Sequence, residues 1–149
     1  MSIEDDVALL ERVPTLRLLG YEALRVLAIG AEQQQFARGS ILFHTGDDAD
    51  AGYVVQDGAF RLGLDGKPEY DVIAERGTLI GELALIVEMQ RPATATALEY
   101  SSVIRIPRTL FVRVLDSDPA AALRLREEFA HRSRQATSDI LMATAKLSI

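Results

Sequence analysis

The sequence predicts an α+β fold, in which an antiparallel β-roll of the jelly-roll type, with about eight strands, is flanked by N-terminal helices and two C-terminal helices. Three observations predict it. Residues 1–35 show the apolar spacing of helices, residues 36–106 alternate short β-rich segments with turn dipeptides, and residues 107–149 return to helical spacing. No low-complexity linker divides the 149 residues, so we expect one domain over 1–149.

Two helices are expected in the N-terminal segment. The first runs from Asp5 to Arg12 and is ended by Pro14, because proline does not continue a helix. The second runs from Glu22 to Ala31. Its apolar residues recur at i, i+3, i+4 and i+7, which is the spacing of an amphipathic helix: Leu24, Leu27, Ala28 and Ala31.

Short β-rich segments follow, and most of them are closed by a turn signal. Asp57-Gly58 and Asp65-Gly66 are hairpin-turn dipeptides. Between them Phe60, Leu62 and Leu64 share one face of a strand, since side chains alternate along a strand. The expected strands lie at residues 41–43, 53–55, 59–64, 70–74, 93–97 and 102–106.

Two helices are expected after the roll. Pro107 suits a first helical position, and Asp118-Pro119 has the form of an N-cap followed by a proline at N1. The last helix carries a stripe at spacings of three and four, apolar in six of its seven positions: Leu125, Phe129, Arg132, Ala136, Ile140, Ala143 and Leu147. This stripe either packs on the chain's own roll or meets a partner helix, and the residues leave both alternatives open.

Composition excludes several classes of function. The chain has no cysteine, which rules out disulfides, thiolate metal sites and cysteine nucleophiles, and two histidines are too few for a multi-imidazole metal site. The net charge of −6 argues against nucleic acid, and the C-terminal arginines are interrupted by Glu127 and Glu128, as on a solvated helix face. No secretory signal and no apolar run of roughly 20 residues are present. We expect a cytoplasmic protein without a membrane or nucleic-acid partner.

The stretch GELALIVEMQRPATATA, residues 81–97, carries the candidate site. A short helix that begins after Gly81 offers free backbone N–H groups to an anion, and Arg91 can bind phosphate oxygens with two N–H donors. Glu82 suits a sugar hydroxyl. From the residues alone, these parts fit a ligand with one phosphate and one ribose, whereas the alternative is that Glu82 and Arg91 form a surface ion pair or do not interact.

The order of motifs resembles that of cyclic-nucleotide-binding domains, which occur in protein kinase A regulatory subunits, cyclic-nucleotide-gated channels and the bacterial catabolite activator family. Their phosphate-binding cassette is matched by Ile80–Leu85 (IGELAL) and by Arg91–Thr94 (RPAT). Upstream, Ser40–Asp47 is similar to the family's entry motif and Tyr53–Gly58 to its hairpin, while Leu24–Phe36 matches the leading helix. The resemblance covers roughly residues 5–130.

The resemblance implies roles for the cassette. Glu82 would accept a hydrogen bond from the ribose 2′-hydroxyl, Arg91 would hold the cyclic phosphate, and the backbone N–H groups of Ala84 and Leu83 would donate to phosphate oxygens. Thr94 matches a small hydroxyl position. The implied ligand-binding residues are Gly81, Glu82, Leu83, Ala84, Arg91, Pro92, Ala93 and Thr94.

Two residues depart from the family pattern. Ile80 replaces an aromatic residue, which is a mild change. Pro92 stands where relatives use a backbone N–H on the phosphate, and proline has none. Such a loss costs roughly 1.5–3 kcal/mol, or about ten- to a hundred-fold in affinity. Pro92 also lacks the hydroxyl that guanine-selective relatives often carry there, so cAMP is favoured over cGMP.

The resemblance implies a regulatory domain without catalysis, metal or cofactor, whose ligand is cAMP or cGMP. The C-terminal helices would move on binding and pass the signal to another protein, with a homodimer through the last helix as the first expectation. An alternative is a ligand-free protein-interaction module on the same fold. An enzyme on a cupin-like roll would need a histidine cluster that the chain lacks.

Overall fold

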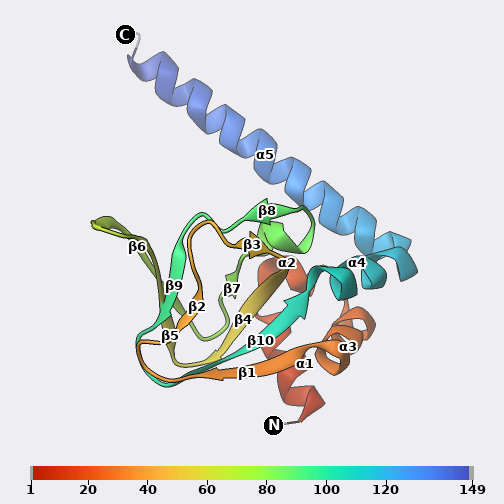
Figure 1. Ribbon diagram of the computed structural model, residues 1–149. Helices are drawn as coiled ribbons and strands as arrows, with labels where there is room; N and C mark the ends of the chain where they lie inside the picture. Colours follow the sequence, from red (N-terminus) through yellow and green to blue (C-terminus); the bar gives the residue numbers. More distant parts are fainter. Residues whose placement is uncertain (1, 148–149) are drawn as a thin grey trace.

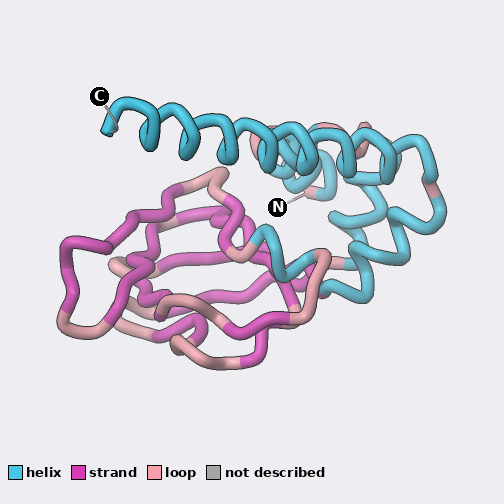
Figure 2. The backbone as a smooth tube through the Cα atoms, turned by 90° about the horizontal axis from the view of Figure 1, so that it is seen from above, coloured by secondary structure: helices cyan, strands magenta, loops and turns pink. Residues whose placement is uncertain are grey.

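The computed structural model describes the backbone of residues 2–147 and the side chains of residues 2–132, 134 and 135. Within these limits the chain forms ten strands, five α-helices and one 3-10 helix, more strands than the about eight expected. Figure 1 shows the strands as a roll beside a group of helices, and Figure 2 shows α5 running along one side of both. The predicted α+β roll is therefore confirmed.

Three helices precede the roll: α1 (Ile3–Glu11), α2 (Pro14–Arg17) and α3 (Tyr21–Gly30). Helix α1 begins with a capping box, in which the Asp5 N–H donates to Ser2 Oγ at 3.1 Å and the Ser2 N–H donates to the Asp5 carboxylate at 3.4 Å. Pro14 follows the end of α1, as expected, and is itself the first residue of α2. A proline is tolerated at this position because its missing N–H is not needed there. The helical segment ends at Gly30 rather than residue 35, since β1 begins at Glu32.

All strand pairs are antiparallel and form three sheets. The first has the order β1 (Glu32–Phe36), β10 (Ser101–Pro107), β4 (Ala51–Asp57) and β7 (Leu79–Ile80). The second has the order β2 (Ile41–Phe43), β9 (Thr94–Ala97), β5 (Ala59–Leu64) and β6 (Lys67–Glu75). The third pairs β3 (Asp48–Ala49) with β8 (Met89–Gln90).

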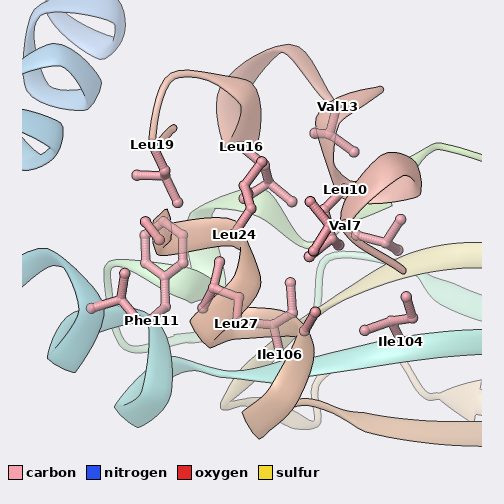
Figure 3. Close-up of a cluster of buried hydrophobic side chains, with 14 of the residues drawn as sticks. Val7, Leu10, Val13, Leu16, Leu19, Leu24, Leu27, Ile104, Ile106 and Phe111 are labelled. Atoms are coloured by element: carbon pink, nitrogen blue, oxygen red, sulfur yellow. The ribbon is translucent and has the colours of Figure 1, made fainter. Parts of the chain in front are cut away.

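Strand β4 separates two apolar cores. Because side chains alternate along a strand, Tyr53 and Val55 point into the roll, where they pack with Phe60 and Phe43. Val54 points the other way, into a core shared with the helices. Figure 3 shows leucines of the N-terminal helices, Phe111 and Ile106 meeting in this second core. The strand is buried on both faces, so it holds the roll and the helices together.

Two helices follow the roll, α4 (Arg108–Ser117) and α5 (Pro119–Leu147). Pro107 is the residue before α4 rather than its first residue, whereas Asp118 caps α5 as expected, with its Oδ1 accepting from the Ala121 N–H at 3.1 Å. Leu125 is buried and Phe129 packs against the helical core. The start of the predicted stripe thus packs on the chain's own body, and its last four positions lie outside the described side chains.

Helix α5 is anchored near its start by a side chain bonded to backbone. Arg124 donates from Nε to the Leu18 carbonyl at 2.7 Å and from Nη2 to the Leu19 carbonyl at 3.4 Å. No helix in the part of the chain that the structure describes is long and apolar enough to cross a membrane.

Candidate anion-binding site

The cassette folds as a tight turn between β7 and β8. Gly81 follows β7 with φ 78° and ψ 41°, and the expected short helix is a single 3-10 turn, η1 (Glu82–Leu85). A Cβ at Gly81 would lie 2.5 Å from Nη1 of Arg91 and 3.4 Å from the Ala51 carbonyl oxygen. Glycine is therefore required twice, for the left-handed backbone and for the close approach of the guanidinium.

Arg91 is held inside the roll, with 4% of its surface exposed. Its Nη2 donates to the Ala51 carbonyl at 2.8 Å. The guanidinium carbon lies 4.3 Å from the ring centre of Phe43 and 5.4 Å from that of Tyr53, which is the geometry of a cation–π contact. Backbone bonds fix the residue further, since the Arg91 N–H donates to the Asp47 carbonyl at 2.7 Å.

The charge of Arg91 has no counter-charge in contact with it. Among the side chains that the structure describes, no carboxylate forms an ion pair with Arg91, and its buried Nε has no hydrogen-bond partner. Burial lowers the pKa of Arg91 below its ordinary value, since desolvation disfavours the charged form. Buried cations are normally paired, so this arrangement favours an anion beside the guanidinium.

A hollow of about 220 Å³ opens next to Arg91. Six of the eight predicted ligand-binding residues line it: Gly81, Glu82, Leu83, Arg91, Pro92 and Ala93. Four further residues line it as well: Phe43, Leu62, Ile80 and Met89. Pockets for small molecules usually hold roughly 300–1,000 Å³, so a nucleotide that placed its phosphate here would extend beyond the hollow.

The other two predicted residues do not line this hollow. Ala84 is fully buried, and its N–H donates to the Gly81 carbonyl at 3.1 Å as part of the 3-10 turn. Thr94 lies on the outer face of β9, where its Oγ1 accepts from the Thr45 N–H at 2.9 Å. Alternation along β9 turns the Thr94 side chain away from the roll interior, whereas the donation expected from the Ala84 N–H stays a prediction.

Phe43 and Tyr53 are site residues that the sequence analysis did not assign. Both lie in quoted motifs, but only Phe43 follows more exposed residues on its strand, whereas Tyr53 lies in a strand that is buried on both faces. The motifs alone do not show that the two rings converge on one guanidinium, since β2 and β4 belong to different sheets.

Glu82 does not pair with Arg91. Its Oε2 accepts from the Thr15 hydroxyl at 2.8 Å, and its Oε1 accepts from Nη1 of Arg132. Nη2 of Arg132 also donates to the Thr15 hydroxyl oxygen at 2.6 Å. The surface ion pair between Glu82 and Arg91, which the residues had left open, is absent from the described part of the chain, and Glu82 is bound by α5 instead.

These features describe a β-roll domain in which a buried arginine and a glycine-led turn form a cradle for an anionic group. The sequence model of the cyclic nucleotide-binding domain family matches residues 33–118, more than half of the chain. The chain belongs to the cyclic nucleotide-binding domain family, which confirms the resemblance that the cassette motifs indicated.

Solved structures with the same fold include two that share more than a quarter of their residues with this chain. The N-terminal domain of a transcriptional regulator from Streptomyces coelicolor A3(2) is 29% identical with a TM-score of 0.80, over 89% of this chain and 94% of that one. A cyclic nucleotide-binding-like protein from Brucella abortus is 36% identical with a TM-score of 0.67, over 75% of this chain and 98% of that one.

Curated relatives are much longer proteins. The lysophospholipase nte1 of Aspergillus oryzae is 30% identical over 131 residues, which cover 86% of this chain and 8% of that protein. The lysophospholipase NTE1 of Coccidioides immitis is 33% identical over 106 residues, which cover 69% of this chain and 7% of that protein. The chain therefore spans less than a tenth of the length of these relatives.

Proposed function

We propose that this domain is a non-catalytic cyclic-nucleotide sensor, which favours cAMP over cGMP and signals to another protein through movement of α4 and α5. The observation that carries the proposal is Arg91, a buried guanidinium whose Nε has no partner and which faces a hollow lined by the cassette. A cyclic phosphate supplies one negative charge and two free oxygens, which match the charge and the donor geometry of arginine.

The remaining groups fit the other parts of the ligand. Glu82 lines the same hollow and can accept from a ribose hydroxyl, while Phe43, Leu62 and Met89 give it apolar walls. Leu83 is half exposed on η1 at the mouth of the hollow, where a base that extends outward would pass.

Calorimetric titration with cAMP and cGMP tests the proposal. We expect saturable binding of cAMP that is at least about ten-fold weaker in Arg91→Ala, because a hydrogen-bonded charge pair is lost. Arg61→Ala is the matched control, since Arg61 is half exposed, lies outside the hollow and pairs only with Asp71 at 3.6 Å. Absence of binding to a folded wild-type protein would refute the sensor.

Pro92 supplies a second test of the same site. Pro92→Ala restores a backbone N–H at the mouth of the hollow, so we expect cAMP to bind roughly ten-fold more tightly. Pro68→Ala controls for the added chain flexibility, because Pro68 is exposed near the start of β6. Unchanged affinity in Pro92→Ala would show that this N–H does not reach the phosphate.

The second candidate function is a ligand-free interaction module. Two observations favour it: Pro92 offers no N–H to a phosphate, and Glu82 is bound by Thr15 and Arg132. In that case neither nucleotide shifts the melting temperature, and Arg91→Ala changes stability alone.

The output is proposed to pass to another protein, and a second copy of this chain docked along α5 is the first partner to test. Light scattering after size exclusion, with and without cAMP, measures whether the domain is a dimer. A cytoplasmic location is proposed as well, since cyclic nucleotides act as intracellular messengers in the family that the sequence resembles.

A further inference from the structure

Three residues from distant parts of the sequence meet beside the hollow. Thr15 comes from α2, Glu82 from η1 and Arg132 from α5, and each of them is hydrogen-bonded to the other two. The Thr15 hydroxyl donates to Glu82 and accepts from Arg132, so both its proton and an oxygen lone pair are used. Thr15 is 2% exposed, which places the cluster at the edge of the helical core.

Arg132 is also held in place from its own helix. Its guanidinium carbon lies 5.2 Å from the ring centre of Phe129, and its Nε donates to Glu128 at 3.4 Å. Among the side chains that the structure describes, Arg132 with Glu82 is the one ion pair that joins α5 to the rest of the chain. Figure 1 shows that the C-terminal part of α5 projects away from the roll.

Two groups therefore compete for Glu82: the guanidinium of Arg132 and a ribose hydroxyl of the proposed ligand. Glu82 lines the hollow that Arg91 faces, and a ribose hydroxyl bound there would need an oxygen of this carboxylate. Oε2 already accepts from Thr15 and Oε1 from Arg132. A hydroxyl that donates to a carboxylate paired with a guanidinium gains less than one that donates to a free carboxylate, because the negative charge is already compensated.

We infer that Arg132 is a specificity-determining residue, because it competes with the ligand's 2′-hydroxyl for Glu82. Binding of that hydroxyl displaces Arg132 from Glu82 and thereby releases α5. This inference rests on the proposed function. Coupling between two binding events is reciprocal. Arg132 therefore weakens the binding of the 2′-hydroxyl to Glu82 by the same factor by which the hydroxyl weakens the binding of Arg132 to Glu82. A ligand without the 2′-hydroxyl binds through Arg91 and leaves Arg132 on Glu82.

The test compares cAMP with 2′-deoxy-cAMP on the wild type and on Arg132→Gln. Glutamine favours helix and removes the charge. We expect Arg132→Gln to tighten cAMP about 5- to 150-fold, the usual range of coupling, and to change 2′-deoxy-cAMP less than about two-fold. Arg126→Gln is the matched control, since Arg126 is exposed on the same helix. Equal changes for both ligands, or no change for either, would overturn the inference.

The outcomes separate the inference from the function on which it rests. If 2′-deoxy-cAMP binds to the wild type and is lost in Arg91→Ala, the nucleotide site stands whatever Arg132→Gln does. If no nucleotide binds to any folded variant, the proposed function fails and the inference fails with it. Thr15→Val is a second variant, which removes one hydrogen bond on each of its partners, so cAMP should tighten in the same direction by a smaller factor.

A distance measurement tests the release of α5 directly. The natural chain has no cysteine, so spin labels at Glu127→Cys on α5 and Lys67→Cys on the β6 hairpin report one distance between two exposed positions. We expect saturating cAMP to shift this distance in the labelled double variant that keeps Arg132, and 2′-deoxy-cAMP to leave it unchanged. A shift of equal size with both ligands would show that the phosphate alone moves the helix.

Discussion

Arg91 places a charged group where the surrounding atoms solvate it poorly. The carbonyl of Ala51 and the rings of Phe43 and Tyr53 compensate part of the lost hydration, and Nε remains without a partner. Burial of a charge without its counter-charge is destabilising, so we expect Arg91 to lower the stability of the domain when no anion is bound.

Arg91→Met measures this cost at the scale of one residue. Methionine keeps most of the length and loses the charge, so we expect the free energy of unfolding without ligand to rise by about 1 kcal/mol. Arg105→Met is the control, because Arg105 pairs with Asp50 at 3.1 Å and with Glu32 at 3.5 Å, and we expect its loss to be neutral or destabilising. Urea unfolding measures both, and a clear loss of stability in Arg91→Met would contradict the prediction.

Gly81→Ala tests the close approach of backbone and guanidinium. We expect a loss of about 1–2 kcal/mol from the left-handed backbone, with cAMP affinity lowered at least about ten-fold because the new methyl displaces Arg91. Gly39→Ala separates the two effects: its φ is +86°, and no atom lies within 4 Å of the new methyl. Gly39→Ala should therefore lose stability and keep its affinity, as chemical denaturation and calorimetry can show.

The residues of the site were predictable to different degrees. Gly81, Glu82 and Arg91 were identified because a glycine, a carboxylate and an arginine at this spacing match a known motif. The roles expected for Ala84 and Thr94 stay predictions: the Ala84 N–H closes the 3-10 turn, and alternation turns the Thr94 side chain outward. The partner of Glu82 could not be predicted, since Arg132 is 50 residues away in the sequence.

At the scale of elements, the cassette depends on α4 for its position. Nη1 of Arg108, the first residue of α4, donates to the carbonyls of Ala49 at 2.8 Å, Val87 at 3.0 Å and Ala84 at 3.2 Å. One guanidinium nitrogen thus connects α4 to β3, to η1 and to the segment that follows η1. We therefore expect a shift of α4 to move the turn as well.

Arg108→Met removes this connection. We expect a loss of about 1–3 kcal/mol, since hydrogen bonds to a charged donor are lost and buried carbonyls are left without it. Amide hydrogen exchange should rise over residues 82–90 more than elsewhere. Arg113→Met on the exposed face of α4 serves as the control and should change neither quantity. Uniform loosening of the whole roll would contradict a local role.

Some elements were predictable from pattern and others were not. Strands rich in apolar residues, such as β5 and β10, were found at nearly their observed bounds. Strand β1 (EQQQF) was missed because four polar residues give no apolar period, and β3, β7 and β8 have two residues each, which is too short for any period. These strands are defined by their pairing: β1 pairs with β10, β7 pairs with β4, and β3 and β8 pair with each other.

At the scale of the whole molecule, the helical core and the roll share β4, so stability measured by any global method reports both. Asp6 lies on α1 facing β4, and Gln56 of β4 donates to it from Nε2 at 3.2 Å. Desolvation by burial raises the pKa of Asp6 above its ordinary value of 3.8, although the chain's amino terminus and the bond from Gln56 act in the opposite direction.

The pH dependence of folding follows from that shift. The folded state binds the Asp6 proton more tightly than the unfolded state, so its contribution to stability is lost as pH rises from 3.8 through the folded pKa. We expect Asp6→Asn to be more stable than the wild type at pH 7 and the difference to shrink toward pH 3.5. Urea unfolding at both pH values checks this, with Glu11→Gln on the exposed side of α1 as control. A difference that does not depend on pH would contradict it.

The length of α5 gives its contact with Glu82 a mechanical meaning. The helix has 29 residues, so at 1.5 Å of rise per residue it is about 43 Å long, with about 22 Å beyond Arg132. In the proposed release of Arg132 from Glu82, α5 would act as a lever arm that is still held near its start by Arg124. A tilt there would displace the backbone near Leu147 by a larger distance than the change at the carboxylate, and a neighbouring protein would detect this displacement.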